Sequence, residues 1–225
     1  LPNIAGFVGG DHSATLLASE TGTDQPVVIM DIGTNTEISL VDSDSITSVS
    51  CPSGPAFEGG HLSSGMRAAE GAIELVRIKG DEVLVDTIGE GSPVGICGSG
   101  VLDAVAQLHL AGICNARGQI QTGHDRVRSE RDQNRFVLVG HEETGGVEIA
   151  MTQDDIRAVQ LAKGAIRAAV DQLLERTGYA EKDICQVVVA GAFGNYIDIS
   201  SALSIGMLPD LPYTCFAQVG NAAGE

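Results

Sequence analysis

The stretch VVIMDIGTNTEISLV, residues 27–41, constrains the fold more than any other part of this chain. An apolar run ends on Asp31, turns through Gly-Thr-Asn-Thr, and resumes as a second apolar run. Short apolar runs rich in Val and Ile, separated by a turn that contains glycine, predict two buried antiparallel strands. A buried hairpin has no need of an acid beside its turn, so Asp31 and Gly33 are the first candidates for a functional role.

The turn itself has two interpretations. A β-turn at Gly33 leaves the amides of Gly33, Thr34 and Asn35 outside the hairpin pairing, so that they can converge on an anion, and Thr34 and Thr36 add hydroxyl groups. Asp31 then suits a Mg²⁺ ion, usually through water, or the positioning of an attacking water molecule. In the alternative, this is an ordinary hairpin in which Asp31 accepts from its own turn amides. The stretch alone leaves both open.

The apolar pattern of the rest of the chain predicts an α/β fold. Strands are predicted at residues 27–30, 36–41, 46–51, 136–139, 147–150, 184–190 and 214–219, and helices at 101–110, 153–176 and 199–205. Because strands alternate with helices after an opening three-stranded meander, we expect a mixed sheet of the five-stranded type flanked by helices. Thr152 and Asp155 have capping-box spacing at the start of the long helix.

Two segments look like additions to this sheet. Residues 74–79 and 82–88 predict a hairpin that turns at Gly80 and Asp81, so an inserted hairpin is expected at about 73–89. The stretch at about 115–135 is the most polar of the chain, and its charges are of mixed sign. We therefore expect it to be a solvent-facing excursion without a binding role.

Three more glycine-rich loops are candidates for ligand contacts, each with a structural alternative. In SGPAFEGG (53–60), glycines would let the backbone approach a ligand, and a following helix start would offer free N–H groups; a flexible connector is the alternative. GICGSG (95–100) is an anion cradle by its spacing, or a set of glycines for close helix packing. VVVAGAFGN (187–195) runs from a buried strand into a turn at the kind of sheet edge where α/β proteins bind ligands, or is a plain strand-to-helix turn.

Composition excludes several classes of protein. The net charge of −17 and the aromatic content of 4%, with no Trp, disfavour nucleic-acid binding. No apolar run reaches the roughly 20 residues that span a bilayer, and there is no signal peptide. The five cysteines show no CxxC pair, which predicts reduced thiols in a cytoplasmic protein and no metal cluster. The histidines show no i,i+4 pair or neighbouring nucleophile, so no catalytic histidine is expected. Since there is no initiator Met, we expect a piece of a longer protein.

The loops together resemble one family. DIGTNTE, GPAFEGG, GICGSGVLDAV, QLAKGAI and AGAFGNYID, in this order, resemble the ATP-dependent reductive activators of corrinoid proteins, which belong to the superfamily of actin, sugar kinases and heat-shock chaperones. DIGTNTE is similar to the second phosphate motif of that superfamily, VVVAGAFGN to its adenosine motif, and VGNAAGE to the start of its final connecting helix. IAGFVGGDHSATLLA resembles the end of the superfamily's first half. The resemblance covers nearly the whole chain.

The resemblance implies an actin-like, RNase H-type domain. Residues 1–24 would be the tail of the preceding actin-like half, and residues 25–225 the second half. The first half and a [2Fe-2S] ferredoxin-like domain would lie outside this chain, so we expect weak or no ATPase activity from this half alone. The implied function is the use of ATP to drive the reduction of Co(II) corrinoid to Co(I). The implied partner is a corrinoid protein or corrinoid-dependent methyltransferase, and a homo-oligomer is expected.

The same resemblance implies roles for individual residues. Asp31 would be the catalytic residue, serving Mg²⁺, through water, and the attacking water. The other implied ATP contacts fall on three groups of loop residues: Gly33, Thr34, Asn35 and Thr36 for the phosphates; Ser53, Gly54, Gly59 and Gly60 in the second loop; and Gly191, Ala192, Phe193, Gly194 and Asn195 for adenosine.

Two other functions are compatible with the same loops. A small-molecule kinase of the same superfamily would share these loops, and so would a non-catalytic actin-like module in which the nucleotide is a switch for partner binding. A four-cysteine ferredoxin pattern upstream would favour the activator.

The activators of 2-hydroxyacyl-CoA dehydratases are similar in layout and carry a cluster-binding cysteine before a similar glycine loop. CPSGPAFEGG departs from their pattern, so no cluster is expected at Cys51.

Overall fold

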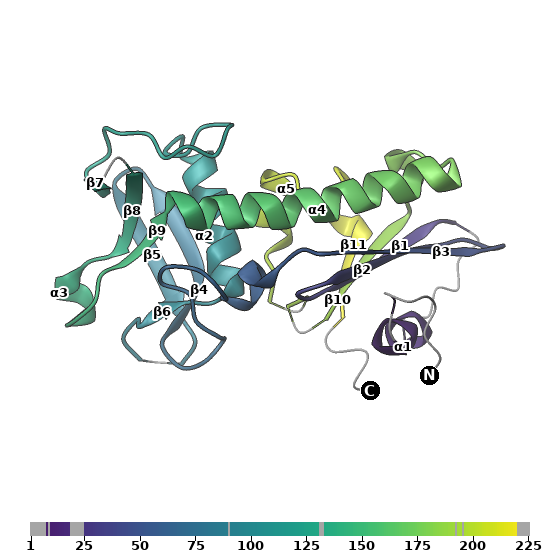
Figure 1. Cartoon of the computed structure of the whole chain (residues 1–225), viewed down its shortest axis with the longest axis horizontal. Coiled ribbons are helices and arrows are strands. Elements are labelled where there is room, and N and C mark those ends of the chain that lie inside the picture. Colours follow the sequence, from purple (N-terminus) through teal and green to yellow (C-terminus); the bar gives the residue numbers. More distant parts are fainter. Residues whose placement is uncertain are drawn as a thin grey trace. The chain divides into compact units, whose positions relative to one another are not determined.

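The computed structural model in Figure 1 describes residue 8 and residues 10–18, 25–89, 91–130, 133–191, 193–194 and 196–219. The chain forms two compact units. The first unit comprises Leu1–Gly54 and Lys163–Glu225, and the second unit is residues 55–162. The long helix α4 (Gln153–Thr177) contributes residues to both units.

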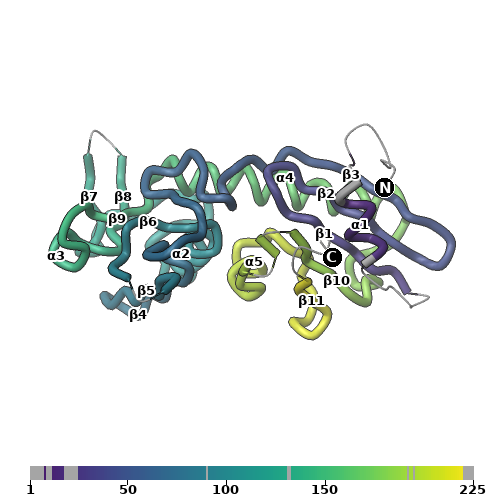
Figure 2. Tube along the Cα trace, turned by 90° about the horizontal axis from the view of Figure 1, so that it is seen from below, coloured from purple at the N-terminus to yellow at the C-terminus, as the bar shows by residue number. Residues whose placement is uncertain are grey.

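The first unit is built on a five-stranded sheet in the order β11-β10-β1-β2-β3. β1 pairs in parallel with β10 and antiparallel with β2, so the sheet is mixed, as the sequence predicted. Figure 1 shows the C-terminal part of α4 on one face of this sheet and α1 on the other, and Figure 2 shows the same arrangement from below. The elements of this unit are α1 (Gly10–Ala18), β1 (Val27–Ile32), β2 (Thr36–Val41), β3 (Ile46–Cys51), η2 (Glu181–Asp183), β10 (Gln186–Ala190), α5 (Ile199–Ser204), η3 (Tyr213–Cys215) and β11 (Phe216–Gln218).

Burial explains why the central strands have continuous apolar runs. In β1, Val27, Val28, Ile29 and Met30 are all buried, because this strand lies inside the sheet with both of its faces covered. By contrast, β3 lies at an edge and is mostly half-exposed. The run that opened the sequence is therefore the centre of the first unit's core, and the acid at its end lies at the rim of that core.

The second unit contains two three-stranded sheets, in the orders β5-β4-β6 and β7-β8-β9, and the buried helix α2. The hairpin predicted at about 73–89 is present as β4 and β5, and α2 packs against β4. A Cβ atom added at Gly100 of α2 would lie 2.2 Å from the carbonyl oxygen of Ile73, so glycine permits this close packing. The elements of this unit are η1 (Pro55–Glu58), β4 (Ala72–Lys79), β5 (Glu82–Thr87), β6 (Gly95–Ile96), α2 (Gly98–Leu110), β7 (Val127–Glu130), β8 (Gln133–Val139), α3 (His141–Thr144), β9 (Ile149–Thr152) and the start of α4.

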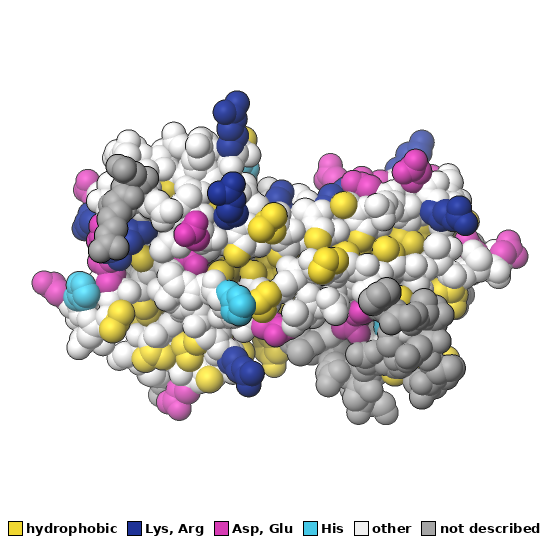
Figure 3. All heavy atoms as spheres, in the orientation of Figure 1, with side chains coloured by type: hydrophobic (Ala, Val, Ile, Leu, Met, Phe, Trp, Pro, Cys, Tyr) yellow, Lys and Arg dark blue, Asp and Glu magenta, His cyan; other side chains and the backbone are white. Residues whose placement is uncertain are grey.

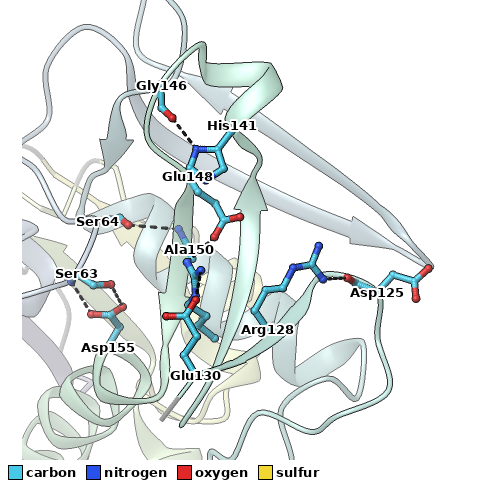
Figure 4. Close-up of polar contacts among 11 residues, drawn as sticks. Ser63, Ser64, Asp125, Arg128, Glu130, His141, Gly146, Glu148, Ala150 and Asp155 are labelled. Atoms are coloured by element: carbon cyan, nitrogen blue, oxygen red, sulfur yellow. Dashed lines mark hydrogen bonds and ion pairs between the residues drawn. The ribbon is translucent and has the colours of Figure 1, made fainter. Parts of the chain in front are cut away.

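The predicted capping box of α4 is confirmed and has an additional partner. The Asp155 carboxylate accepts from the Thr152 amide at 2.8 Å and from its hydroxyl at 2.7 Å. It also accepts from the amide of Ser63 at 2.8 Å and from the Ser63 hydroxyl, as Figure 4 shows. Asp155 is only 3% exposed, so this buried charge is stabilised by four donors and fixes the loop around Ser63 to the start of the helix.

The polar stretch at about 115–135 faces solvent, as expected, but it is not only a loop. It contains β7, which pairs with β8, and the Ser129 hydroxyl donates to the Asn134 side chain at 2.6 Å. Its loop is fixed to α4, because the Gln153 amide group donates to the carbonyl of Gly118 and accepts from the amide of Ile120 at 3.1 Å. The β7 strand is largely exposed, so it has no apolar alternation by which the sequence could have indicated it.

Charged side chains show no single-signed patch on the face drawn in Figure 3, where Asp and Glu are scattered with Lys and Arg among them. Of the helices that the structure describes, none has the length and apolar character needed to cross a membrane.

Candidate functional site

The carboxyl ends of β1 and β10 lie side by side in the sheet. The two strands are parallel, and their register pairs Asp31 with Ala190. The turn that follows β1 and the turn that follows β10 therefore leave the sheet at the same edge. In α/β sheets this is the edge at which ligands bind. Two of the loops predicted from sequence are thus brought together in the first unit.

The turn after β1 is held in shape by the segment that follows β3. The Ser53 hydroxyl donates to the carbonyl of Gly33 at 2.8 Å and lies 2.7 Å from the Thr36 hydroxyl. The amide of Gly54 donates to the carbonyl of Thr34 at 2.8 Å. Ser53 and Thr36 are buried, so this small network of hydrogen bonds holds the backbone of the turn in one conformation. Ser53 and Gly54 accordingly lie beside the turn; their predicted contact with ATP stays a prediction.

These bonds orient the amides of the turn. In a trans peptide the N–H points away from the C=O of the same unit, and none of the described peptide bonds is cis. Because the carbonyls of Gly33 and Thr34 are directed at Ser53 and Gly54, the N–H groups of Thr34 and Asn35 point away from that segment. Thr34 and Asn35 are exposed. Two successive amides directed to one exposed side form the type of concavity that binds anions.

Asp31 lies between two elements at this edge. Its Oδ2 accepts from the Thr15 hydroxyl of α1 at 3.2 Å. On the other side, a Cβ atom added at Gly191 would lie 2.6 Å from Oδ1 of Asp31 and 2.8 Å from the carbonyl oxygen of Ile32. Gly191 also has a φ of +93°, in the region that favours glycine. The start of the turn after β10 can therefore approach the acid this closely only with glycine at that position.

The turn after β10 is compact. A Cβ atom at Gly194 would lie 2.5 Å from the carbonyl oxygen of Ala190, and the Gln218 side chain of β11 donates to the carbonyl of Gly194 at 2.7 Å. Phe193 is 8% exposed, so its ring anchors the turn and is not available at the surface to stack on a base. Ala192 and Asn195, which were also predicted to contact adenosine, lie outside the described residues.

The prediction of a helix start after SGPAFEGG is wrong, because turns and then the strand β4 follow this loop in the described residues. Gly59 and Gly60 lie in the second unit. They follow the short 3₁₀ turn η1, and their amides donate to the carbonyls of Ala56 and Pro55 at 3.1 and 3.0 Å. A Cβ atom at Gly59 would lie 2.0 Å from the carbonyl oxygen of Met66. These observations give the two glycines a role in turn formation and close backbone packing.

The cysteines next to the glycine loops have structural surroundings. Burial raises the pKa of the Cys51 thiol to about 11, with a further rise from the charge of Glu37. A thiol that stays protonated is a poor metal ligand and nucleophile. Cys97 is also buried, and its thiol donates to the carbonyl of Ile73 at 3.2 Å. Of the two interpretations of GICGSG, the structure shows the one in which its glycines permit close helix packing, as Gly100 does against the carbonyl of Ile73.

The structure also shows contacts that the sequence analysis missed. His12 and Thr15 of α1 are 0% and 1% exposed, and Thr15 contacts the candidate catalytic acid. The Nε2 atom of His12 lies 2.7 Å from the hydroxyl of Ser39. These contacts join residues 16 and 27 positions apart, and no local pattern in the sequence could have indicated them.

A magnesium ion fits this site only as one bound chiefly by water and phosphate. No group of three or more His, Cys, Asp and Glu side chains that could hold a metal ion occurs in the described part of the chain. Mg²⁺ keeps several waters and commonly uses one or two carboxylates together with substrate phosphates. Asp31, half-buried beside the exposed residues Thr34 and Asn35, provides one such carboxylate.

The mixed sheet, the acid at the end of its central strand and the two glycine turns at one edge define an actin-like α/β domain. In agreement, a family model described as the C-terminal domain of RACo, the ASKHA domain, matches residues 25–225, and the chain belongs to this family. The fold class predicted from sequence is confirmed.

Similar proteins carry related names. The chain is 38% identical to the corrinoid activation enzyme RamQ of Eubacterium limosum, over 100% of this chain and 39% of that protein. It is 30% identical to a [Co(II) methylated amine-specific corrinoid protein] reductase of Methanosarcina barkeri, over 92% of this chain and 39% of the reductase. A solved structure of a reductive activator for corrinoid,iron-sulfur protein superposes with a TM-score of 0.93 at 39% identity, over 99% of this chain and 36% of that one. The chain thus spans about two fifths of the length of these relatives.

Proposed function

We propose that this chain is the ATP-binding C-terminal part of a reductive activator, which couples ATP hydrolysis to the reduction of Co(II) corrinoid to Co(I) on a partner protein. The observation that carries the proposal is the convergence of Asp31, the turn at 33–36 and Gly191 at one sheet edge. It is supported by the names of the three similar proteins, all of which refer to corrinoid activation or to reduction of a corrinoid protein. The partner is then a corrinoid protein or corrinoid-dependent methyltransferase.

Each part of the site has a distinct task in this proposal. The outward amides of Thr34 and Asn35 bind phosphate oxygens, and the carbonyls of the same turn are kept away from the anion by Ser53 and Gly54. Asp31 would orient the attacking water and would hold a Mg²⁺ ion, through water, beside the phosphates. When bound, Mg²⁺ neutralises charge that develops on the phosphates. The turn from Gly191 onward contacts the nucleoside through its backbone.

The remaining parts of the activator are proposed to lie in segments other than this one. A first actin-like half would close on the nucleotide from the other side, and a [2Fe-2S] domain would deliver one electron to each Co(II). ATP hydrolysis would supply the energy that makes this unfavourable electron transfer proceed. We further propose that the protein is cytoplasmic and forms a homo-oligomer.

The test is a spectrophotometric assay of the corrinoid partner with the full-length activator and a chemical reductant. We expect the absorbance of Co(I) to appear with MgATP, and not without nucleotide or with a non-hydrolysable ATP analogue. Phosphate release should rise in step with Co(I). Formation of Co(I) at the same rate without ATP would contradict the proposal, and transfer of the phosphoryl group to a small molecule would point to the kinase alternative.

A further inference from the structure

Helix α1 lies outside residues 25–225, the part of the chain that the family model matches, yet it contributes to the candidate site. His12 and Thr15 are three positions apart and so lie on one face of the helix. Both are buried, at 0% and 1% exposure, whereas Leu17 on the same helix is 70% exposed. Two polar side chains thus share the buried face of α1 with the partly buried Leu16, which packs against the core of the sheet.

His12 anchors this helix to the sheet. Its Nε2 atom lies 2.7 Å from the Ser39 hydroxyl of β2, which in turn lies 2.6 Å from the Ser48 hydroxyl of β3. Ser39 is fully buried, so these bonds are shielded from water. The position of α1 on the sheet is therefore fixed by a polar contact only one turn away from Thr15.

Thr15 acts on Asp31 directly. Its hydroxyl donates to Oδ2 at 3.2 Å, and Gly191 lies so close to Oδ1 that an added Cβ would be only 2.6 Å from it. A half-buried carboxylate with a close neighbour at each of its two oxygens can adopt few rotamers.

We propose that Thr15 is a positioning residue for Asp31, so that a segment before the matched domain completes the site. The inference rests on the proposed function, because it takes Asp31 to be the acid that orients water. The hydroxyl fixes the carboxylate in the rotamer that hydrolysis needs. Catalytic groups lose efficiency when their supporting contacts leave them about 1 Å too loose.

The test compares Thr15→Val, which keeps the shape and removes the hydroxyl, with Thr15→Ser, which keeps the hydroxyl, in the full-length activator. Because the hydroxyl bonds to a charged group, we expect Val to lower the kcat of ATP hydrolysis about tenfold or more. The Kd for ATP should change by less than about twofold, because Thr15 positions the acid and does not bind the nucleotide. Ser should restore kcat, and Leu17→Ala, an exposed control on the same helix, should leave it unchanged.

A purely structural role gives a different result. It predicts that Tm and kcat fall together in Thr15→Val and that Thr15→Ser does not restore kcat, and either this outcome or an unchanged kcat in Thr15→Val would overturn the inference. Asp31→Asn, measured in parallel, separates the two proposals. If Asp31→Asn is inactive while Thr15→Val is fully active, only the role of Thr15 is lost. If Asp31→Asn still hydrolyses ATP, both the proposed function of the site and the role of Thr15 are contradicted.

Discussion

Replacing Asp31 by alanine is expected to abolish ATP hydrolysis in the full-length activator and to leave the fold intact. The side chain is half-buried at the rim of the core, and its strand is held by the apolar residues that precede it. Loss of a group that stabilises the transition state costs at least about a hundredfold in kcat. The measurement is phosphate release at saturating MgATP, with circular dichroism to follow the fold.

Asp44→Ala is the matched control for this variant. Asp44 lies in the exposed turn between β2 and β3 of the same unit, and its backbone amide bonds to the Asp42 side chain. The replacement keeps that amide and removes an aspartate carboxylate that lies outside the candidate site. Turnover should therefore stay at the wild-type level. Near-wild-type turnover in Asp31→Ala would remove this acid from the mechanism.

Replacing Gly191 by alanine is expected to lower both the free energy of unfolding and the rate of ATP hydrolysis by a large amount. The new Cβ atom would lie 2.6 Å from Oδ1 of Asp31 and 2.8 Å from the carbonyl oxygen of Ile32, so either the acid or the turn has to move. The φ of +93° adds a cost of about 1 kcal/mol for any side chain. With overpacking at about 1–3 kcal/mol, the free energy of unfolding should fall by about 2–4 kcal/mol. Hydrolysis should be lost with it, because either movement disturbs the candidate site: Asp31 itself or the turn beside it.

Gly206→Ala separates the two causes. Gly206 belongs to the same unit and has a φ of +69°, but the nearest atom to an added Cβ is the Lys163 Nζ at 3.9 Å. This variant should therefore lose only about 1 kcal/mol in the free energy of unfolding and keep its hydrolysis rate. Equal losses in both variants, in chemical denaturation and in phosphate release, would show that steric contact with Asp31 has no part in the effect.

The sequence predicted those elements whose burial produces a local pattern. The second and third strands were expected at 36–41 and 46–51 and are observed as Thr36–Val41 and Ile46–Cys51. The long helix was expected at 153–176 and ends at Thr177. In β2 and α4, buried apolar side chains recur at the period of the element, so the sequence alone reports which face is buried. The edge strand β3 has no such pattern and was predicted from the turn at 42–44 that precedes it.

Other features depend on contacts between distant parts of the chain. The strand β7 has only polar or half-exposed side chains, so its pairing with β8 produces no apolar alternation. The bond from Ser53 to Gly33 joins residues 20 positions apart, and that from Ser63 to Asp155 joins residues 92 apart. The sequence identified Ser53 as a candidate through the resemblance of its loop. It gave no indication of Thr15, whose role depends on where α1 packs.

Gly59 and Gly60 illustrate the limit of reading glycines from a motif. A glycine can mark a ligand contact or a close approach of two backbone segments, and the letters are the same in both cases. At Gly191 the approach is to a candidate catalytic acid, whereas at Gly59 it is to the backbone of Met66. Only the structure separates the two uses.

The central claim is that the turns after β1 and β10 together form the nucleotide site. Hydrogen–deuterium exchange of the full-length activator, with and without saturating MgATP, tests it at the level of the amides. We predict slower exchange with MgATP at Thr34 and Asn35 and in the turn that begins at Gly191. Unchanged exchange in both turns, while the same sample hydrolyses ATP, would contradict the claim.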